Sequence, residues 1–371
     1  MIYLDNAATT YNKPKGVWQA MARSYANPGR GGSRASLEAS SIVYDCRERL
    51  ASLFGIDNLQ RIIFASNTTD ALNLAIKGLI KKGDHVIMSG MEHNSVVRPV
   101  IATRAQYSVV KPDAFGRVTP QGYERLIKSN TRLIIATHAS NITGTINPIR
   151  EIGQLARSRG IPFLVDGAQT AGAVPINVKD DNIDLLAFPG HKLLFGPQGT
   201  GGLYIKEGID LVPLKEGGTG SLSESLVQPD FLPDRFESGT INTNGIAGLL
   251  QGVKFIQQTG IESIRQREIK LTDRLLKGLE NTKNIQLYGP PVPSMRTGIV
   301  SFNIKGKDSV TVATELDQKY GIVCRGGMHC SALGHRSMGT LETGMVRLST
   351  SHFTTEKEID KTILAVKTLA K

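Results

Sequence analysis

Residues 184–197 read DLLAFPGHKLLFGP, and the interpretation of the whole chain starts from this stretch. Its first part, Asp184 to Phe188, has the length and apolar composition of a buried strand. Lys192 follows among glycine and apolar residues, which is a poor setting for a solvated charge. Burial lowers the pKa of an amine and frees it as a nucleophile towards an aldehyde. Lone lysines are more often surface residues with buried stems, so Lys192 needs support from other residues.

Apolar runs of the same kind recur along the first two thirds of the chain and alternate with helical patterns. The strand-like runs are 61–65, 85–88, 132–136, 162–165, 184–188 and 202–205. The helical patterns are 71–79, 121–128 and 149–159. Strands that alternate with helices predict an α/β fold with a mostly parallel sheet covered on both faces.

The last third of the chain has a different pattern. One long helical stretch is predicted at 245–279, and Gly289-Pro290-Pro291 follows it. Short strand signals and further helices come after, at 298–303, 309–320, 345–349 and 356–369. We therefore expect a large α/β domain at 15–259 and a smaller α+β domain made of 1–14 with 260–371.

Polar residues follow several of these runs, where ligands bind in open parallel sheets. Asp166 would need a cationic partner if buried, such as a protonated pyridine nitrogen, although capping of a following helix explains it equally well. Residues 66–70, SNTTD, offer hydroxyls and backbone N–H groups to a phosphate. That segment alone is better explained by a simple helix cap, with Thr68 or Asp70 as the capping residue.

Three further residues suggest chemistry at this edge. A flat imidazole at His93 would stack on an aromatic ring and shuttle protons, although hydrogen-bonded loop histidines are more common. Residues 325–330, RGGMHC, place the thiol of Cys330 beside basic residues in a glycine-containing loop, which favours a mobile thiolate. Arg347 interrupts an apolar strand pattern, where its planar fork would clamp a carboxylate.

Composition excludes several classes of protein. Three cysteines fit reduced thiols better than a disulfide framework or a zinc site, and Cys46 and Cys324 are interpreted as packing residues. The net charge of +11 is scattered, so we expect no nucleic-acid partner. No apolar stretch is long enough to span a bilayer, and the start at Met1 does not resemble a signal peptide. We expect a cytoplasmic protein with no membrane contact and no metal.

These residues, in this order, resemble the fold-type I pyridoxal-phosphate enzymes of the class V aminotransferase group. Within that group the chain is similar to the cysteine desulfurase and selenocysteine lyase family. The resemblance runs from residues 3–10, YLDNAATT, to the strand holding Arg347, and the RGGMHC segment is similar to the Suf-type branch. It implies conversion of L-cysteine (or L-selenocysteine) to L-alanine, pyridoxal 5'-phosphate as cofactor, a homodimer, and transfer of sulfur to an acceptor protein.

The resemblance also implies roles for individual residues. Lys192 would hold the cofactor as a Schiff base and Asp166 would pair with its ring nitrogen, while Cys330 would accept the sulfur. His93 would stack on the ring as a further catalytic residue. The complete cofactor-binding set would be Lys192, Thr68, Thr69, His93, Asn141, Asp166, Gln169, His191 and Thr240, with Thr240 reaching across a dimer. The substrate would contact Arg347, Asn141 and Ala8.

Two departures from the family pattern are visible. Many relatives carry Ser or Thr where this chain has Pro189, which offers neither a hydroxyl nor an N–H to a phosphate. Many also carry a histidine near the segment that reads Arg30-Gly31-Gly32-Ser33 here. The open alternatives are a selenocysteine lyase, a cysteine or cystine C–S lyase or aminotransferase in which Cys330 is incidental, and a non-catalytic protein on the same fold.

Overall fold

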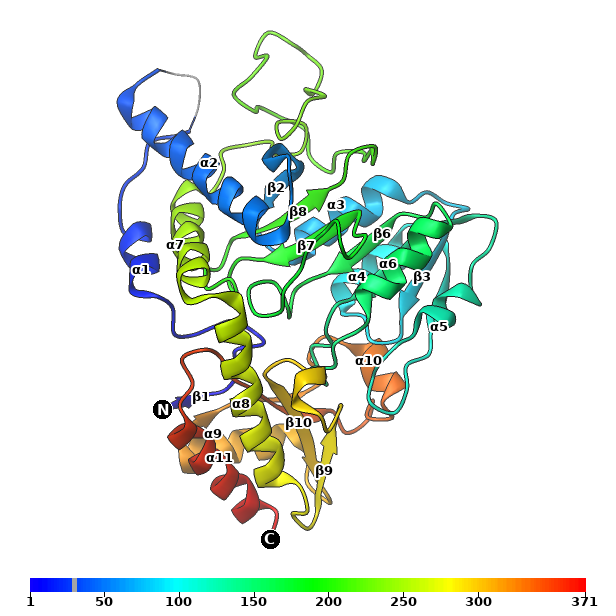
Figure 1. Ribbon diagram of the computed structural model, residues 1–371, viewed down its shortest axis with the longest axis vertical. Helices are drawn as coiled ribbons and strands as arrows, with labels where there is room; N and C mark the ends of the chain where they lie inside the picture. Colours follow the sequence, from blue (N-terminus) through cyan, green and yellow to red (C-terminus); the bar gives the residue numbers. More distant parts are fainter. Residues whose placement is uncertain (29–31) are drawn as a thin grey trace.

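The larger part of the molecule is built around one seven-stranded sheet. The computed structural model describes residues 1–28 and 32–371, and Figure 1 shows this sheet in its upper half. The strand order is β2-β8-β7-β6-β5-β3-β4, and only β8 runs antiparallel to its neighbours. The strands are β2 (Ile62–Ala65), β3 (His85–Ser89), β4 (Gln106–Val110), β5 (Thr131–Thr137), β6 (Phe163–Asp166), β7 (Leu185–Pro189) and β8 (Gly201–Ile205). The prediction of a mostly parallel sheet is confirmed.

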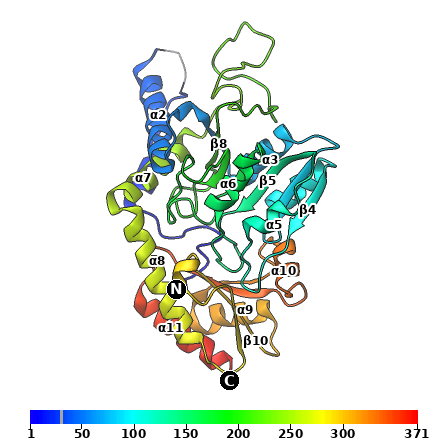
Figure 2. The ribbon, with the colours of Figure 1, turned by 45° about the vertical axis from the view of Figure 1, so that its right-hand side comes forward.

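Helices cover both faces of this sheet, which explains why its strands are apolar throughout (Figure 2). One core contains Leu186 and Phe188 and packs against α2 (Arg34–Phe54), α5 (Pro120–Glu124), α6 (Ile149–Ser158) and α7 (Thr243–Thr259). The other core contains Leu185 and Ala187 and packs against α3 (Thr68–Leu79) and α4 (Asn94–Ala102). Successive residues of β7 therefore serve opposite cores, as strand geometry requires.

The smaller part contains both chain ends and a four-stranded sheet of order β12-β13-β10-β9 (Figure 1). Its elements are α8 (Ile261–Leu279), β9 (Ile285–Tyr288), β10 (Ile299–Ile304), α9 (Ser309–Tyr320), β12 (Arg325–Gly327), β13 (Met345–Ser349) and α11 (Glu356–Leu369). The short elements β1 (Ile2–Tyr3) and β11 (Ile322–Val323) pair in parallel. The remaining short elements are α1 (Lys15–Met21), η1 (Leu59–Arg61), η2 (Pro293–Met295) and α10 (Ala332–Ser337).

Two expectations about elements need correction, and one strand of the large sheet was not predicted. The single helix predicted at 245–279 is two helices, because Gly260 takes φ +84 between α7 and α8. The helix predicted at 121–128 is the short α5. Strand β4 was not predicted, since it is an edge strand whose first residues are exposed and carry little apolar signal. The boundaries given above for two domains stay a prediction. No helix in the described residues is long and apolar enough to cross a membrane.

A glycine on α7 supports the loop that carries Lys192. A Cβ atom added to Gly252 would lie 2.2 Å from the Leu194 carbonyl oxygen and 2.9 Å from the Phe195 carbonyl carbon. Because backbone atoms cannot move aside like a flexible side chain, we expect Gly252→Ala to destabilise the fold by about 1–3 kcal/mol. Urea unfolding checks this. Gly218→Ala is the matched control, since a Cβ there meets no heavy atom within 4 Å, and equal stability of the two variants would contradict the prediction.

Candidate active site

A cavity lies at the carboxyl ends of the parallel strands, where the sequence predicted it. Asp166 ends β6, while His93, Asn141 and Lys192 follow β3, β5 and β7. Its described lining is Asn67, Thr68, Thr69, Leu72, His93, Ser95, Thr137, Ala139, Asn141, Asp166, Ala168, Gln169, His191 and Lys192. Eight of the nine residues predicted to hold the cofactor are thus brought together. The ninth, Thr240, lies in other hollows beside Glu237 and Ser238.

Lys192 and Asp166 form the chemical centre of this cavity. Among the described residues, Lys192 Nζ makes no hydrogen bond and no ion pair. Burial lowers its pKa to about 8; Asp166 opposes this shift, and Arg347 adds to it. Asp166 accepts a hydrogen bond from the Ala168 backbone N–H at 2.9 Å, and burial raises its pKa. No helix follows Asp166, so the alternative that it caps one is wrong.

His93 lines the cavity as a neutral imidazole. It caps α4, and its Nδ1 accepts a hydrogen bond from the Ser95 backbone N–H at 3.1 Å. The neutral ring therefore carries its proton on Nε2. Burial lowers the pKa of His93 to about 4, and the positive charges of Lys192, Arg347 and Arg98 add to this effect. His93 is thus both a hydrogen-bonded loop histidine and a flat wall of the cavity.

Unpartnered polar atoms gather at the start of α3. Asn67 caps this helix by accepting from the Asp70 backbone N–H at 2.9 Å, so the expectation that Thr68 or Asp70 caps it is wrong. Thr69 Oγ1 lies 2.8 Å from Ser95 Oγ. Thr68 Oγ1 and His191 Nδ1 are buried, and neither has a partner among the described residues. Buried polar atoms normally have partners, and a phosphate at a helix N-terminus would supply them.

Six lining residues were not predicted as site residues: Asn67, Leu72, Ser95, Thr137, Ala139 and Ala168. All lie within four positions of a predicted site residue, and that proximity was the only signal available. Pro189 ends β7 opposite Gly201 and does not line the cavity. The other departure, at Arg30 and Gly31, lies outside the described residues.

The N-terminal segment closes the cavity from the side of the smaller sheet. Gln169 Nε2 donates to the Ala7 carbonyl oxygen at 3.1 Å, which brings the neighbouring Ala8 close to the cavity. Arg347 is buried, and its Nη1 and Nη2 donate to the Asn141 carbonyl at 2.9 Å and to Asp5 Oδ1 at 2.8 Å. Its Nε has no partner among the described residues. The guanidinium therefore keeps a buried donor, Nε, that is not satisfied within the described part of the chain.

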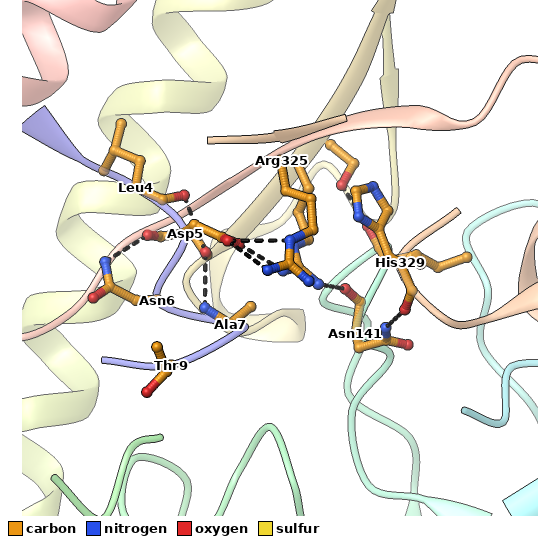
Figure 3. A network of polar contacts seen from close by, with 12 residues as sticks. Leu4, Asp5, Asn6, Ala7, Thr9, Asn141, Arg325 and His329 are labelled. Atoms are coloured by element: carbon orange, nitrogen blue, oxygen red, sulfur yellow. Dashed lines mark hydrogen bonds and ion pairs between the residues drawn. The ribbon is translucent and has the colours of Figure 1, made fainter. Parts of the chain in front are cut away.

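Cys330 is exposed on a turn tied to the cavity wall. Asn141 Nδ2 donates to the His329 carbonyl at 2.8 Å (Figure 3), and the Asn94 backbone N–H donates to the Cys330 carbonyl at 2.9 Å. His329 and Cys330 have φ of +48 and +55, in the left-handed region that non-glycine residues rarely occupy. A glycine-containing loop was expected over 325–330, whereas residues 325–327 form strand β12 and Cys330 lies in the turn that follows. Cys330 lies close enough to Arg347 to influence the pKa of its guanidinium.

Comparison with known proteins identifies the family to which this geometry belongs. The family model for class-V aminotransferases matches residues 2–362. The chain belongs to the class-V aminotransferase family. Members of this family are pyridoxal-phosphate enzymes, and the arrangement of strands and helices is their fold type I. The resemblance, fold class and cofactor predicted from the sequence are therefore confirmed.

Within the family, the similar proteins are cysteine desulfurases. A probable cysteine desulfurase of Methanothermobacter thermautotrophicus is 36% identical over 372 residues, covering 96% of this chain and 92% of that protein. A cysteine desulfurase of Escherichia coli is 33% identical, covering 98% and 92%. The apo structure of a cysteine desulfurase from Thermococcus onnurineus is 33% identical with a TM-score of 0.93, covering 100% of this chain and 94% of the other. The chain is therefore similar over nearly its whole length to cysteine desulfurases.

Proposed function

We propose that the chain is a cysteine desulfurase that converts L-cysteine to L-alanine and takes the sulfur as a persulfide on Cys330. One observation carries the proposal. A single cavity presents the amine of Lys192, the carboxyl of Asp166 and the ring of His93, with Arg347 and Cys330 tied to its wall. This is the set of groups that removal of a proton from an amino acid and capture of its sulfur require.

The cavity fits pyridoxal phosphate. Its phosphate would take the unpartnered Thr68 Oγ1 and His191 Nδ1, with Thr69 beside them. Asp166 would face the ring nitrogen, because a buried carboxyl needs a cationic partner. Lys192 would hold the cofactor covalently, His93 would stack on the ring, and Gln169 and Asn141 would lie at its edge. When bound, the cofactor supplies an electron-withdrawing ring that stabilises charge left on the substrate α-carbon.

The residues of the chain then perform the remaining steps. The free Arg347 Nε would bind the substrate carboxylate, next to Asn141 and Ala8. Lys192 Nζ, when it is not linked to the cofactor, is the base that removes the α-proton, and burial lowers the pKa of this free amine to about 8. The Cys330 thiolate attacks the substrate sulfur, so that an S–S bond forms while the S–Cβ bond breaks. Cβ keeps the electron pair of the broken bond and takes a proton to become the methyl group of alanine, and the α-carbon takes a proton back from Lys192. Carbon is thus reduced as sulfur is oxidised, and no external redox reagent is needed.

The proposal also includes a second copy of this chain and an acceptor protein for the sulfur. Thr240 lies outside the cavity of its own chain, so its predicted phosphate contact requires a second copy and a homodimer. Thr240 lies in the long segment between β8 and α7. The exposed apolar side chains of Leu226, Val227 and Phe231 in the same segment support an interface there. The exposed Cys330 would pass its sulfur to an acceptor protein in the cytoplasm.

The proposal is tested with purified protein loaded with pyridoxal phosphate. We expect L-cysteine and a reductant to give alanine and sulfide in equal amounts over many turnovers. Without a reductant, alanine should stop at about one equivalent per Cys330, because the persulfide is not removed. The same assay with L-selenocysteine measures the competing lyase activity. Pyruvate in place of alanine would indicate a C–S lyase and would reject the proposal.

A further inference from the structure

Asp5 is a carboxylate that lies beside Arg347, the residue proposed to bind the carboxylate of the substrate. Its Oδ1 accepts from Arg347 Nη2 at 2.8 Å. Its Oδ2 accepts from Arg325 Nε at 3.1 Å (Figure 3). Among the described residues, it is the only carboxylate within 4.0 Å of either guanidinium. The two arginines and Asp5 together carry a net charge of +1, from +2 and −1.

The backbone holds Asp5 in this position. Residue 5 forms a parallel bridge with Ser349, two residues after Arg347 on β13. The Ser349 backbone N–H donates to the Leu4 carbonyl at 2.7 Å, and the Ala7 N–H donates to Ser349 Oγ at 2.9 Å. Asn6 Nδ2 also donates to the Ser349 carbonyl at 2.8 Å. The Asp5 carboxylate is therefore fixed beside Arg347 before any ligand arrives.

We propose that Asp5 is a built-in counter-ion that weakens the attraction of Arg347 and Arg325 for the substrate carboxylate and so sets the affinity for the substrate. This inference rests on the proposed function, in which Arg347 Nε binds that carboxylate. A second carboxylate near Arg347 meets the repulsion of Asp5 as well as the attraction of the arginines. The product alanine carries the same carboxylate, so weaker binding also favours its release.

Tighter binding of the substrate carboxylate would bring no gain in kcat. Binding substrate and transition state equally tightly lowers KM without raising kcat, so attraction for the substrate carboxylate is better limited than maximised. An ordinary structural role for Asp5 makes the opposite prediction, because loss of a structural contact loosens the site. The sign of the effect therefore separates the two roles.

The deciding variants change the charge without removing the side chains that fill the space. Asp5→Asn keeps an oxygen for Arg347 and raises the net charge of the group to +2. We expect it to bind propionate, which is a carboxylate without amine or thiol, about ten-fold more tightly than wild type. Arg325→Gln lowers the net charge to zero at a side chain that is 45% exposed, and should weaken propionate binding by about the same factor. The double variant should return to within about two-fold of wild type.

Propionate affinity is measured in two ways on the cofactor-loaded protein. One is its inhibition constant against L-cysteine, and the other is the rise in unfolding temperature with propionate concentration, which needs no turnover. Cysteamine, which has the amine and thiol but no carboxylate, is the matched probe and should change by less than about two-fold in every variant.

Each possible result supports or overturns the counter-ion role of Asp5. Unchanged or weaker propionate binding by Asp5→Asn, or an equal change for cysteamine, overturns the counter-ion role. If Asp5→Asn does not fold by itself, the double variant is compared with Arg325→Gln, since these two differ only in the Asp5 charge, and equal propionate binding by them overturns the counter-ion role. Failure of the proposed function would be recognised separately, since wild-type protein would then release no alanine from L-cysteine.

Discussion

Lys192→Ala is expected to lower the turnover of L-cysteine by about 10³-fold or more, since one positioned acid–base group contributes roughly 10²- to 10⁴-fold. The reason is the lowered pKa of this lysine, about 8, which leaves roughly a tenth of it as free amine at pH 7 and about half at pH 8. An unperturbed lysine, with a pKa near 10.4, would be almost entirely protonated there. The measurement is alanine release at saturating L-cysteine.

Lys192→Arg is the matched control for charge. It keeps a cation beside Asp166, but a guanidinium does not lose its proton in the range where the enzyme works. We therefore expect it to be as inactive as Lys192→Ala. If Lys192→Arg retained a tenth of wild-type turnover, Lys192 would act through its charge, and the assigned proton transfer would be wrong.

Cys330→Ala should lower alanine formation from L-cysteine by about 10²-fold or more, because no thiolate remains to take the sulfur. Binding of L-cysteine should persist, since Arg347 and the cavity are intact. The change in cofactor absorbance on adding L-cysteine measures that binding independently of sulfur transfer. Full activity of Cys330→Ala would reject the persulfide mechanism and leave Cys330 incidental.

Cys324→Ala is the matched cysteine control. The Cys324 thiol is half-buried, and burial raises its pKa to about 12, so it stays protonated near neutral pH. We expect Cys324→Ala to keep activity within about two-fold of wild type. A loss equal to that of Cys330→Ala would mean that both thiols take part in sulfur transfer.

The strands and cavity wall could be predicted because they rest on local patterns. Apolar runs mark buried parallel strands, and polar residues after such runs point to one edge of a sheet, which brought Asp166, His93 and Lys192 together. The break at Gly260 was missed because glycine is tolerated within helical patterns, and its positive φ is not visible in sequence. Strand β4 was missed because its exposed residues carry no periodic apolar signal.

The contacts between distant segments could not be predicted from the residues alone. Asp5 and Arg347 are 342 positions apart, and only the folded chain shows that they pair. The cap at Asn67 depends on the backbone angles at the start of α3, whereas the sequence had offered Thr68 and Asp70 as equal candidates. The unpartnered state of Thr68 Oγ1 and His191 Nδ1 is likewise a property of packing.

The alternation along β7 has a consequence for how this chain can diverge. Leu185 and Ala187 serve one core while Leu186 and Phe188 serve the other, and Lys192 follows four residues later. A one-residue insertion or deletion within 185–188 would turn each side chain beyond it to the opposite face. Side chains that now pack in one core would then face the other core, and Lys192 would shift by about 3.3 Å along the strand direction. A change in the length of β7 would therefore disturb both cores and the position of Lys192, whereas a single substitution affects the packing on one face.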